Sequence, residues 1–495
     1  MISQVLTPHS LASSAPRLLP VAQILAVALL TLACYLNAYY LPPVLPYLVF
    51  ALGLAFIVVD DILGLKFYLL SLLIFDDFPK YFAGVMGGQF NTIFNIQVAG
   101  NTMFMIWTSL MFGKLLLRES MSRQFSVNAL RFPREMKGIL LVFMVAALWG
   151  FPNVLTSAKY YVNDFSFLVN TLVGLYAAYT LVRSEEDLKR YFMLFLVICF
   201  IRYSIVLIDG VGMSMRSVMY TLKAESGAYL SIIPLTYFVI YSYRKKQSGQ
   251  FNRKVYLFLM SCSALTIAYN VVTASRGRFI VLALAFCFAM IVTGKYRIML
   301  FALLAVLAVV GAIYTLNPNF VHYAGWKMAT VRPGTEESAS STVRAIEYHN
   351  IIGQQMDQLH QLPLGTGYGG FFTSRYRPFN MELGTDAYPD EWIARDEYYK
   401  PHSTVLFSLL KFGLIGSLVF YLSLVSISLK SLKAALRIND SSSDILIALS
   451  LALPLLFIVN FTPKTQVLSG VILGVLVTGR ALQVRNENSY NSNRL

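Results

Sequence analysis

The sequence predicts an all-α protein, a polytopic bundle of transmembrane helices, and two observations support that prediction. Hydrophobic residues make up 57% of the 495 residues and charged residues only 13%, whereas an ordinary soluble domain has about 25% charged residues. The apolar residues also gather in runs close to the roughly 20 residues with which a helix crosses a bilayer. A soluble fold of this length has no means of covering so much apolar surface, so lipid is the solvent that fits.

Hydropathy predicts fourteen membrane spans, or about twelve if the short ones at 62–76 and 138–151 are re-entrant or merge with a neighbour. The first apolar run continues into further spans, so we interpret it as the first helix of the bundle and not as a secretory signal. The predicted spans are residues 20–37, 43–58, 62–76, 96–116, 138–151, 165–182, 191–208, 227–243, 255–273, 279–293, 298–314, 403–429, 444–461 and 466–480.

Lysine and arginine gather in the connections on one side of the predicted membrane. Cytoplasmic loops are the basic ones, so that side and both chain termini are predicted to be cytoplasmic. The net charge of +15 then reflects topology, and a nucleic-acid surface is the weaker explanation because the cations are spread over many short loops. The basic connections include residues 118–137, 183–190, 244–254, 295–297 and 430–437.

One long loop, residues 315–402, is predicted on the outer side of the membrane. It separates an N-terminal bundle of about eleven spans, residues 1–314, from C-terminal helices and a cytoplasmic tail, residues 403–495. We expect the loop to be mostly helical. A loop of this length in a helical bundle is usually functional, so the candidate site residues are sought there and at the neighbouring membrane face.

Arginines at the outer face are the candidate anion-binding residues. Arg276 and Arg278 lie between two predicted spans, Arg344 stands near the start of a helix in the long loop, and Arg216 lies in another outer loop. The guanidinium fork binds phosphate oxygens bidentately, which predicts a phosphate site. The alternative for Arg276 and Arg278 is that they anchor helix ends at lipid headgroups, and the residues alone leave both interpretations open.

His402 lies where the long loop re-enters the membrane. Histidine suits proton transfer near neutral pH, and this position favours a chemical role over a structural one. The acids of the loop are interpreted mainly as a solvated face, one member of which is available to orient His402. They have no metal-ligand spacing, so no metal site is predicted. These acids are Asp386, Asp390, Glu391, Asp396 and Glu397.

Three further features of the sequence bear on the site and on helix packing. The glycine string at 365–370 resembles a nucleotide loop only superficially, because no strand precedes it and no P-loop lysine follows it. We interpret it as a tight turn that brings backbone close to a neighbour. Arg202 and Lys411 lie inside predicted spans, where a charge is costly and often functional. Gly413 and Gly416 are predicted to let helices approach closely.

Taken in order, these motifs resemble the O-antigen ligase and O-antigen polymerase superfamily of bacterial membrane glycosyltransferases. The resemblance covers about residues 270–420 and rests on Ser-Arg-Gly at a helical hairpin, an arginine early in the long loop, P-L-G-x-G-x-G, and P-H-S-x-x-L before G-L-I-G. It implies an inner-membrane enzyme whose large loop is periplasmic. Such an enzyme transfers a glycan from undecaprenyl diphosphate to an acceptor hydroxyl, without a nucleotide sugar, another cofactor or a required metal.

The resemblance also implies roles for single residues. Arg276 corresponds to the family's hairpin arginine, Arg344 to its loop arginine and His402 to its loop-end histidine. The arginines are expected to hold the diphosphate, with Arg278 and Arg216 in support, because charge builds on its oxygens in the transition state. His402 is expected to accept or hold the proton of the acceptor hydroxyl.

Two departures from the family pattern bear on the acceptor. Ser403 follows His402 where the family usually has asparagine, and Lys411 stands where an acid often precedes G-L-I-G. These departures favour repeat-unit polymerisation for O-antigen or exopolysaccharide over ligation of a finished glycan to lipid A–core. A lipid-linked oligosaccharide flippase is the alternative from another class, because transporters also place charges inside the bundle, as Arg202 and Lys411 are placed.

Overall fold

The computed structural model describes residues 29–30, 44–75, 93–94, 96–98, 100–121, 134–211, 232–273, 276–294, 339–379, 388–438, 440–459 and 462–492. Within these ranges the regular secondary structure is helical, apart from one hairpin of β1 (Gln97–Val98) with β2 (Asn101–Thr102) and an isolated bridge between Phe372 and Tyr398. The predicted spans that fall on described residues contain helices, but the predicted span 96–116 begins with the β1–β2 hairpin and becomes helical only at Met103. The predicted spans 20–37 and 298–314 lie outside the described residues, except for residues 29–30. The all-α prediction is therefore confirmed.

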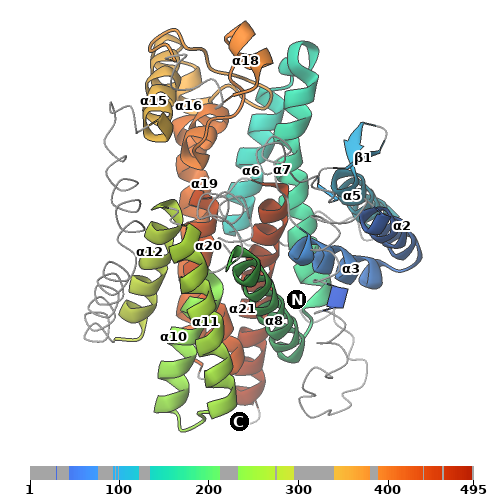
Figure 1. Cartoon of the computed structure of the whole chain (residues 1–495), viewed down its shortest axis with the longest axis vertical. Helices are drawn as coiled ribbons and strands as arrows, with labels where there is room; N and C mark the ends of the chain where they lie inside the picture. The colour runs from blue at the N-terminus through green and yellow to red at the C-terminus, as the bar shows by residue number, and fades with distance from the viewer. Residues whose placement is uncertain are drawn as a thin grey trace.

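Long helices packed side by side form the body of the molecule (Figure 1). Two of them, α7 and α21, approach so closely that a Cβ added to Gly174 would lie 2.0 Å from the carbonyl oxygen of Val467. Among the described helices, α19, α20 and α21 are long and apolar enough to cross a membrane. The body comprises α6 (Arg134–Trp149), α7 (Asn153–Leu181), α8 (Glu185–Val211), α10 (Ile232–Gln247), α11 (Arg253–Thr273), α12 (Arg276–Val292), α19 (Thr404–Leu436), α20 (Ser441–Val459) and α21 (Pro463–Ser492).

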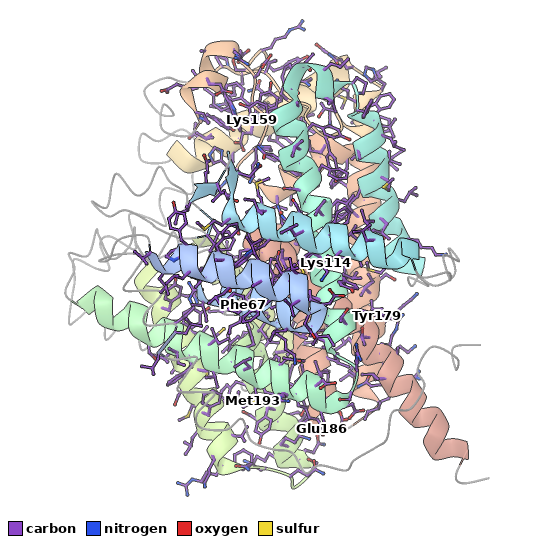
Figure 2. All side chains as sticks on the ribbon, turned by 90° about the vertical axis from the view of Figure 1, so that its right-hand side faces the viewer. Phe67, Lys114, Lys159, Tyr179, Glu186 and Met193 are labelled. Carbon is purple, nitrogen blue, oxygen red and sulfur yellow. The ribbon has the colours of Figure 1, made fainter. Side chains whose placement is uncertain are left out.

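A second, smaller layer of helices lies against the body. It consists of α2 (Val44–Val59), α3 (Asp61–Ile74) and α5 (Met103–Met121). Figure 2 shows that α3, marked by Phe67, and α5, marked by Lys114, run across the long axis of the bundle. Lys114 holds this layer together, because its Nζ lies 2.5 Å from a carboxylate oxygen of Asp61 at the start of α3. The predicted spans here form helices that do not run parallel to the main bundle.

The described part of the long loop forms a cap at one end of the bundle (Figure 1). We define the cap as residues 339–379 and 388–403. It contains α15 (Ala339–Asp357), α16 (Gln361–Leu364) and α18 (Asp390–Arg395), with irregular backbone between them. The cap has an apolar core of its own, which includes Val343, Ile351, Phe372 and Tyr398 and continues into Leu406 and Leu410 of α19. Shared packing thus fixes the cap to the start of α19.

The basic connections that the structure describes in full, residues 183–190, 244–254 and 430–437, lie away from the cap. Arg244 and Lys245, at the end of α10, lie 3.1 and 3.7 Å from the carboxylate of Asp444, near the start of α20 and past the far end of α19. The turn from α10 to α11 is therefore remote from the cap, and α12 begins on the cap side. Figure 2 shows Lys159 of α7 near the cap and Glu186 at the start of α8 toward the other end. The charge pattern predicts that this end of the bundle is cytoplasmic.

The helix α19 is broken at its tenth residue, Gly413, within the predicted span 403–429. Gly413 has φ +68° and ψ −174°, a conformation that is essentially restricted to glycine. The break leaves carbonyl groups without partners in their own helix. The carbonyl of Leu410 accepts the N–H of Thr366 at 2.7 Å, and that of Lys411 accepts the N–H of Gly367 at 3.1 Å. The glycine string of the cap therefore completes the hydrogen bonding of a broken helix, as membrane burial requires.

Replacing Gly413 with alanine is expected to destabilise the protein by about 1–3 kcal/mol or more, because the backbone angles exclude other residues. An added Cβ would also lie 2.4 Å from the backbone nitrogen of Gly365. The midpoint of thermal unfolding in detergent measures the effect. Gly113→Ala in α5 is the control, because a Cβ there meets nothing within 4 Å and alanine favours a helix. Equal midpoints for the two variants would contradict a need for glycine at the break.

Candidate functional site

A buried glutamate holds the candidate histidine of the cap. The Nδ1 atom of His402 lies 2.6 Å from Oε1 of Glu347, and the backbone N–H of His402 donates to both carboxylate oxygens, at 3.0 and 3.1 Å. The Glu347 side chain is fully buried, whereas that of His402 is 37% exposed. The imidazole is thus fixed on its inner edge and keeps access to solvent on the other.

Glu347 reaches His402 from the middle of α15. The neighbouring positions on the same helix face, Val343, Ile346, Asn350 and Ile351, are all buried. Residues three and four apart share one face of a helix, so Glu347 is a lone acid within an otherwise apolar and amide-lined stripe. That placement is the sequence signal that would have identified it. Packing of α15 against α19 brings Glu347 to His402, which lies just before α19 begins.

The prediction that His402 is oriented by one of the later acids of the loop is wrong for those that the structure describes. Glu391 accepts a hydrogen bond from Tyr160 of α7, Asp396 accepts the N–H of Ser374 at 3.0 Å, and Glu397 accepts the hydroxyl of Tyr399 at 2.6 Å. Asp390 lies in the exposed first turn of α18, and Asp386 lies outside the described residues. These acids bind elements of the cap to one another and to α7.

The aromatic ring of Tyr388 lies beside the histidine. The Tyr388 ring lies edge-on to the His402 ring at 4.9 Å between centroids, and its hydroxyl donates a hydrogen bond to Oε1 of Glu347. Burial, with the nearby Glu347 charge, raises the pKa of Tyr388 well above its usual range, so the phenol keeps its proton and acts as a donor. Glu347 therefore accepts hydrogen bonds from the Tyr388 hydroxyl and the His402 backbone, and it also faces Nδ1 of the His402 ring.

Arg344 is the predicted arginine that the structure brings next to this pair. It is exposed on α15, one helical turn before Glu347, and positions three apart on a helix are neighbours. Arg276 and Arg278 begin α12 on the cap side of the bundle, and their side chains are not among the described atoms. Arg216 lies outside the described residues. That these three arginines lie close to Arg344 and bind the same diphosphate stays a prediction.

The glycine string is a docking segment between the cap and three helices of the body. The Tyr368 N–H donates to the carbonyl of Ala146 in α6 at 3.0 Å. The Asn153 amide at the start of α7 donates to the Tyr368 carbonyl at 2.8 Å, and the N–H groups of Thr366 and Gly367 donate to the broken α19. Together these contacts support the interpretation of the string as a tight turn against neighbouring backbone.

The two charges predicted inside spans both have partners. Nζ of Lys411 lies 2.6 Å from Oδ2 of Asp164 in α7, with side chains 0% and 9% exposed. Lys411 also donates to the Gly370 carbonyl at 2.5 Å, and Asp164 accepts the Gly369 N–H at 2.8 Å. Arg202 donates to the Leu73 carbonyl at 2.6 Å. Asp164 was not singled out from the sequence, because nothing in the spacing links it to Lys411.

The comparisons with known proteins agree with the motif order. The family described as O-antigen ligase matches residues 261–421, a stretch that contains Arg276, Arg344, Glu347 and His402. No curated protein and no solved structure matches the chain. The resemblance expected from the motifs is therefore confirmed: over residues 261–421 this membrane protein is similar to the O-antigen ligase family.

Proposed function

We propose that this protein is a membrane glycosyltransferase that moves a glycan from undecaprenyl diphosphate to an acceptor hydroxyl at the cap. The observation that carries the proposal is the half-exposed His402, fixed by a buried glutamate beside an exposed arginine, within the stretch that matches the O-antigen ligase family. The cap would face the periplasm, because the basic connections that the structure describes in full lie away from it.

The proposed reaction is a displacement at the anomeric carbon of the glycan. The acceptor oxygen forms a bond to that carbon while the bond to the diphosphate oxygen breaks, and the electron pair leaves with undecaprenyl diphosphate. The proton of the acceptor hydroxyl passes to Nε2 of His402 and then to water. A group that accepts the proton as the bond forms lowers the barrier, and His402 has the exposed edge that this role needs.

Negative charge builds on the diphosphate as it leaves, and in this proposal the arginines stabilise that charge. Arg344 has no ion-pair partner among the residues that the structure describes, so its guanidinium is available to phosphate oxygens. Arg276 supplies a second guanidinium from the cap-side end of α12 in this proposal, with Arg278 and Arg216 in support. Fixed donors aimed at developing charge are usually the largest single contribution to catalysis.

Replacing Arg344 with alanine is expected to lower the transfer rate by about 10²–10³-fold, the usual effect of losing one charge-stabilising donor. The rate is measured as undecaprenyl diphosphate released by purified protein in proteoliposomes that contain the lipid-linked glycan. Arg375→Ala is the matched control, because Arg375 is another exposed arginine of the cap, 3.9 Å from Asp357. Equal rates for the two variants would remove Arg344 from the mechanism. The same assay on Arg276→Ala tests the second assigned arginine.

Repeat-unit polymerisation for O-antigen or exopolysaccharide is the favoured form of the reaction, and ligation to lipid A–core is the alternative. Deletion of the gene in the native host, followed by separation of surface glycans by size, distinguishes them. Loss of long chains with a single repeat unit left on the acceptor indicates a polymerase. Long chains retained on undecaprenyl diphosphate indicate a ligase. Repeat units trapped on the cytoplasmic side would overturn both and indicate a flippase.

A further inference from the structure

We propose that Glu347 is the positioning residue for His402, holding the imidazole with its proton on Nδ1 so that Nε2 is the proton acceptor. This inference rests on the proposed transfer reaction and deepens it, because the family resemblance assigns His402 and leaves open whether it accepts the proton or only holds the hydroxyl. Glu347 carries no role in that resemblance.

The hydrogen bonds around Glu347 determine which nitrogen carries the proton. A neutral imidazole has one nitrogen that donates and one that accepts. Nδ1 lies 2.6 Å from Oε1 of Glu347, and an ionised carboxylate only accepts hydrogen bonds. The proton of neutral His402 therefore belongs on Nδ1, which leaves the lone pair on Nε2 free. The 37% exposed side chain gives that lone pair access to an acceptor hydroxyl.

The other partners of Glu347 favour its ionised form. The backbone N–H of His402 can only donate, and it reaches both carboxylate oxygens. Tyr388 donates its hydroxyl to Oε1, and it keeps that proton because its pKa is raised by burial. Two donors, the His402 backbone N–H and the Tyr388 hydroxyl, are therefore aimed at the carboxylate, and hydrogen bonds of this kind favour its charged form.

The buried charge also favours proton transfer to His402. Glu347 is fully buried, and an unpaired charge in such a place is costly. Among the described residues it makes no ion pair with lysine or arginine, so the imidazolium formed when His402 accepts a proton is its counter-charge. The pair becomes neutral overall at the moment when the acceptor hydroxyl loses its proton. The same logic governs carboxylate–histidine pairs in other hydrolytic and transfer enzymes.

Glu347→Gln tests this inference. Glutamine has nearly the same shape and still accepts the Tyr388 hydroxyl, yet it has no charge, and its amide N–H opposes either Nδ1 or the His402 backbone. We expect kcat for transfer to fall about 10²-fold or more, with the KM for the lipid-linked donor and the thermal unfolding midpoint unchanged. Glu347→Asp, which restores the charge at a longer distance, is expected to recover part of the lost rate.

Glu391→Gln is the matched control, because Glu391 makes the same type of tyrosine bond elsewhere in the cap. It should keep the wild-type kcat. A Glu347→Gln protein with wild-type kcat overturns the inference, as does a loss that follows a lowered unfolding midpoint and is not recovered by aspartate. These results are distinguishable from failure of the proposed function, in which the wild-type protein itself releases no undecaprenyl diphosphate from the lipid-linked donor.

Discussion

Glutamine in place of His402 is expected to lower glycan transfer by about 10²–10⁴-fold, the range that a general base contributes. The amide of glutamine can still bond to Glu347, and the side chain it replaces is 37% exposed at the start of α19, so little packing is lost. What glutamine cannot do is accept the proton of the acceptor hydroxyl. The release of undecaprenyl diphosphate in proteoliposomes, compared at equal amounts of folded protein, measures the loss.

His349→Gln provides the control for that experiment. His349 lies on α15, two residues after Glu347, and is exposed, so the same substitution is made on the same helix away from the buried pair. We expect it to keep the wild-type transfer rate and unfolding midpoint. If His402→Gln also kept the wild-type rate, transfer would have to proceed without this base, and the arginines alone would carry the catalysis.

The helices of this fold could be predicted from hydropathy because a spanning segment must satisfy its own backbone, which leaves few alternatives to a helix. The predicted spans 255–273 and 279–293, for example, correspond to α11 and α12. Hydropathy could not predict the break in α19, because the broken helix at Gly413 is apolar on both sides. Its bonding is completed by Thr366 and Gly367, more than 40 residues away in the chain.

The site was only partly predictable for a related reason. His402 and Arg344 stand out as polar residues at identifiable places, the re-entry of the loop and the start of a helix. Glu347 stands out only as a lone acid on the apolar stripe of α15, and its link to His402 comes from contacts across 55 residues of chain, which no spacing reveals. The exposed acids of the loop drew attention because acids usually face solvent, and that is where the structure places Asp390 and Glu391.

Replacing Lys411 with methionine is expected to destabilise the protein by about 3–5 kcal/mol, because removing one partner of a buried ion pair leaves the other charge uncompensated. Lys411 is 0% exposed, and its partner Asp164 comes from α7. The pair also holds the glycine string, through the Gly370 carbonyl and the Gly369 N–H. The midpoint of thermal unfolding in detergent measures the loss for Lys411→Met and, in a separate protein, for Asp164→Asn.

The double variant Asp164→Asn/Lys411→Met separates stability from activity. It contains neither charge, so we expect it to be more stable than Lys411→Met alone, since exchange of a whole buried pair for neutral groups is often tolerated. If the transfer rate recovers together with stability, the pair acts by holding the glycine string and α19 in place beneath His402. If stability recovers and the rate does not, the charge of Lys411 contributes to the reaction itself. A Lys411→Met protein as stable as wild type would show instead that Asp164 is not charged in the folded protein.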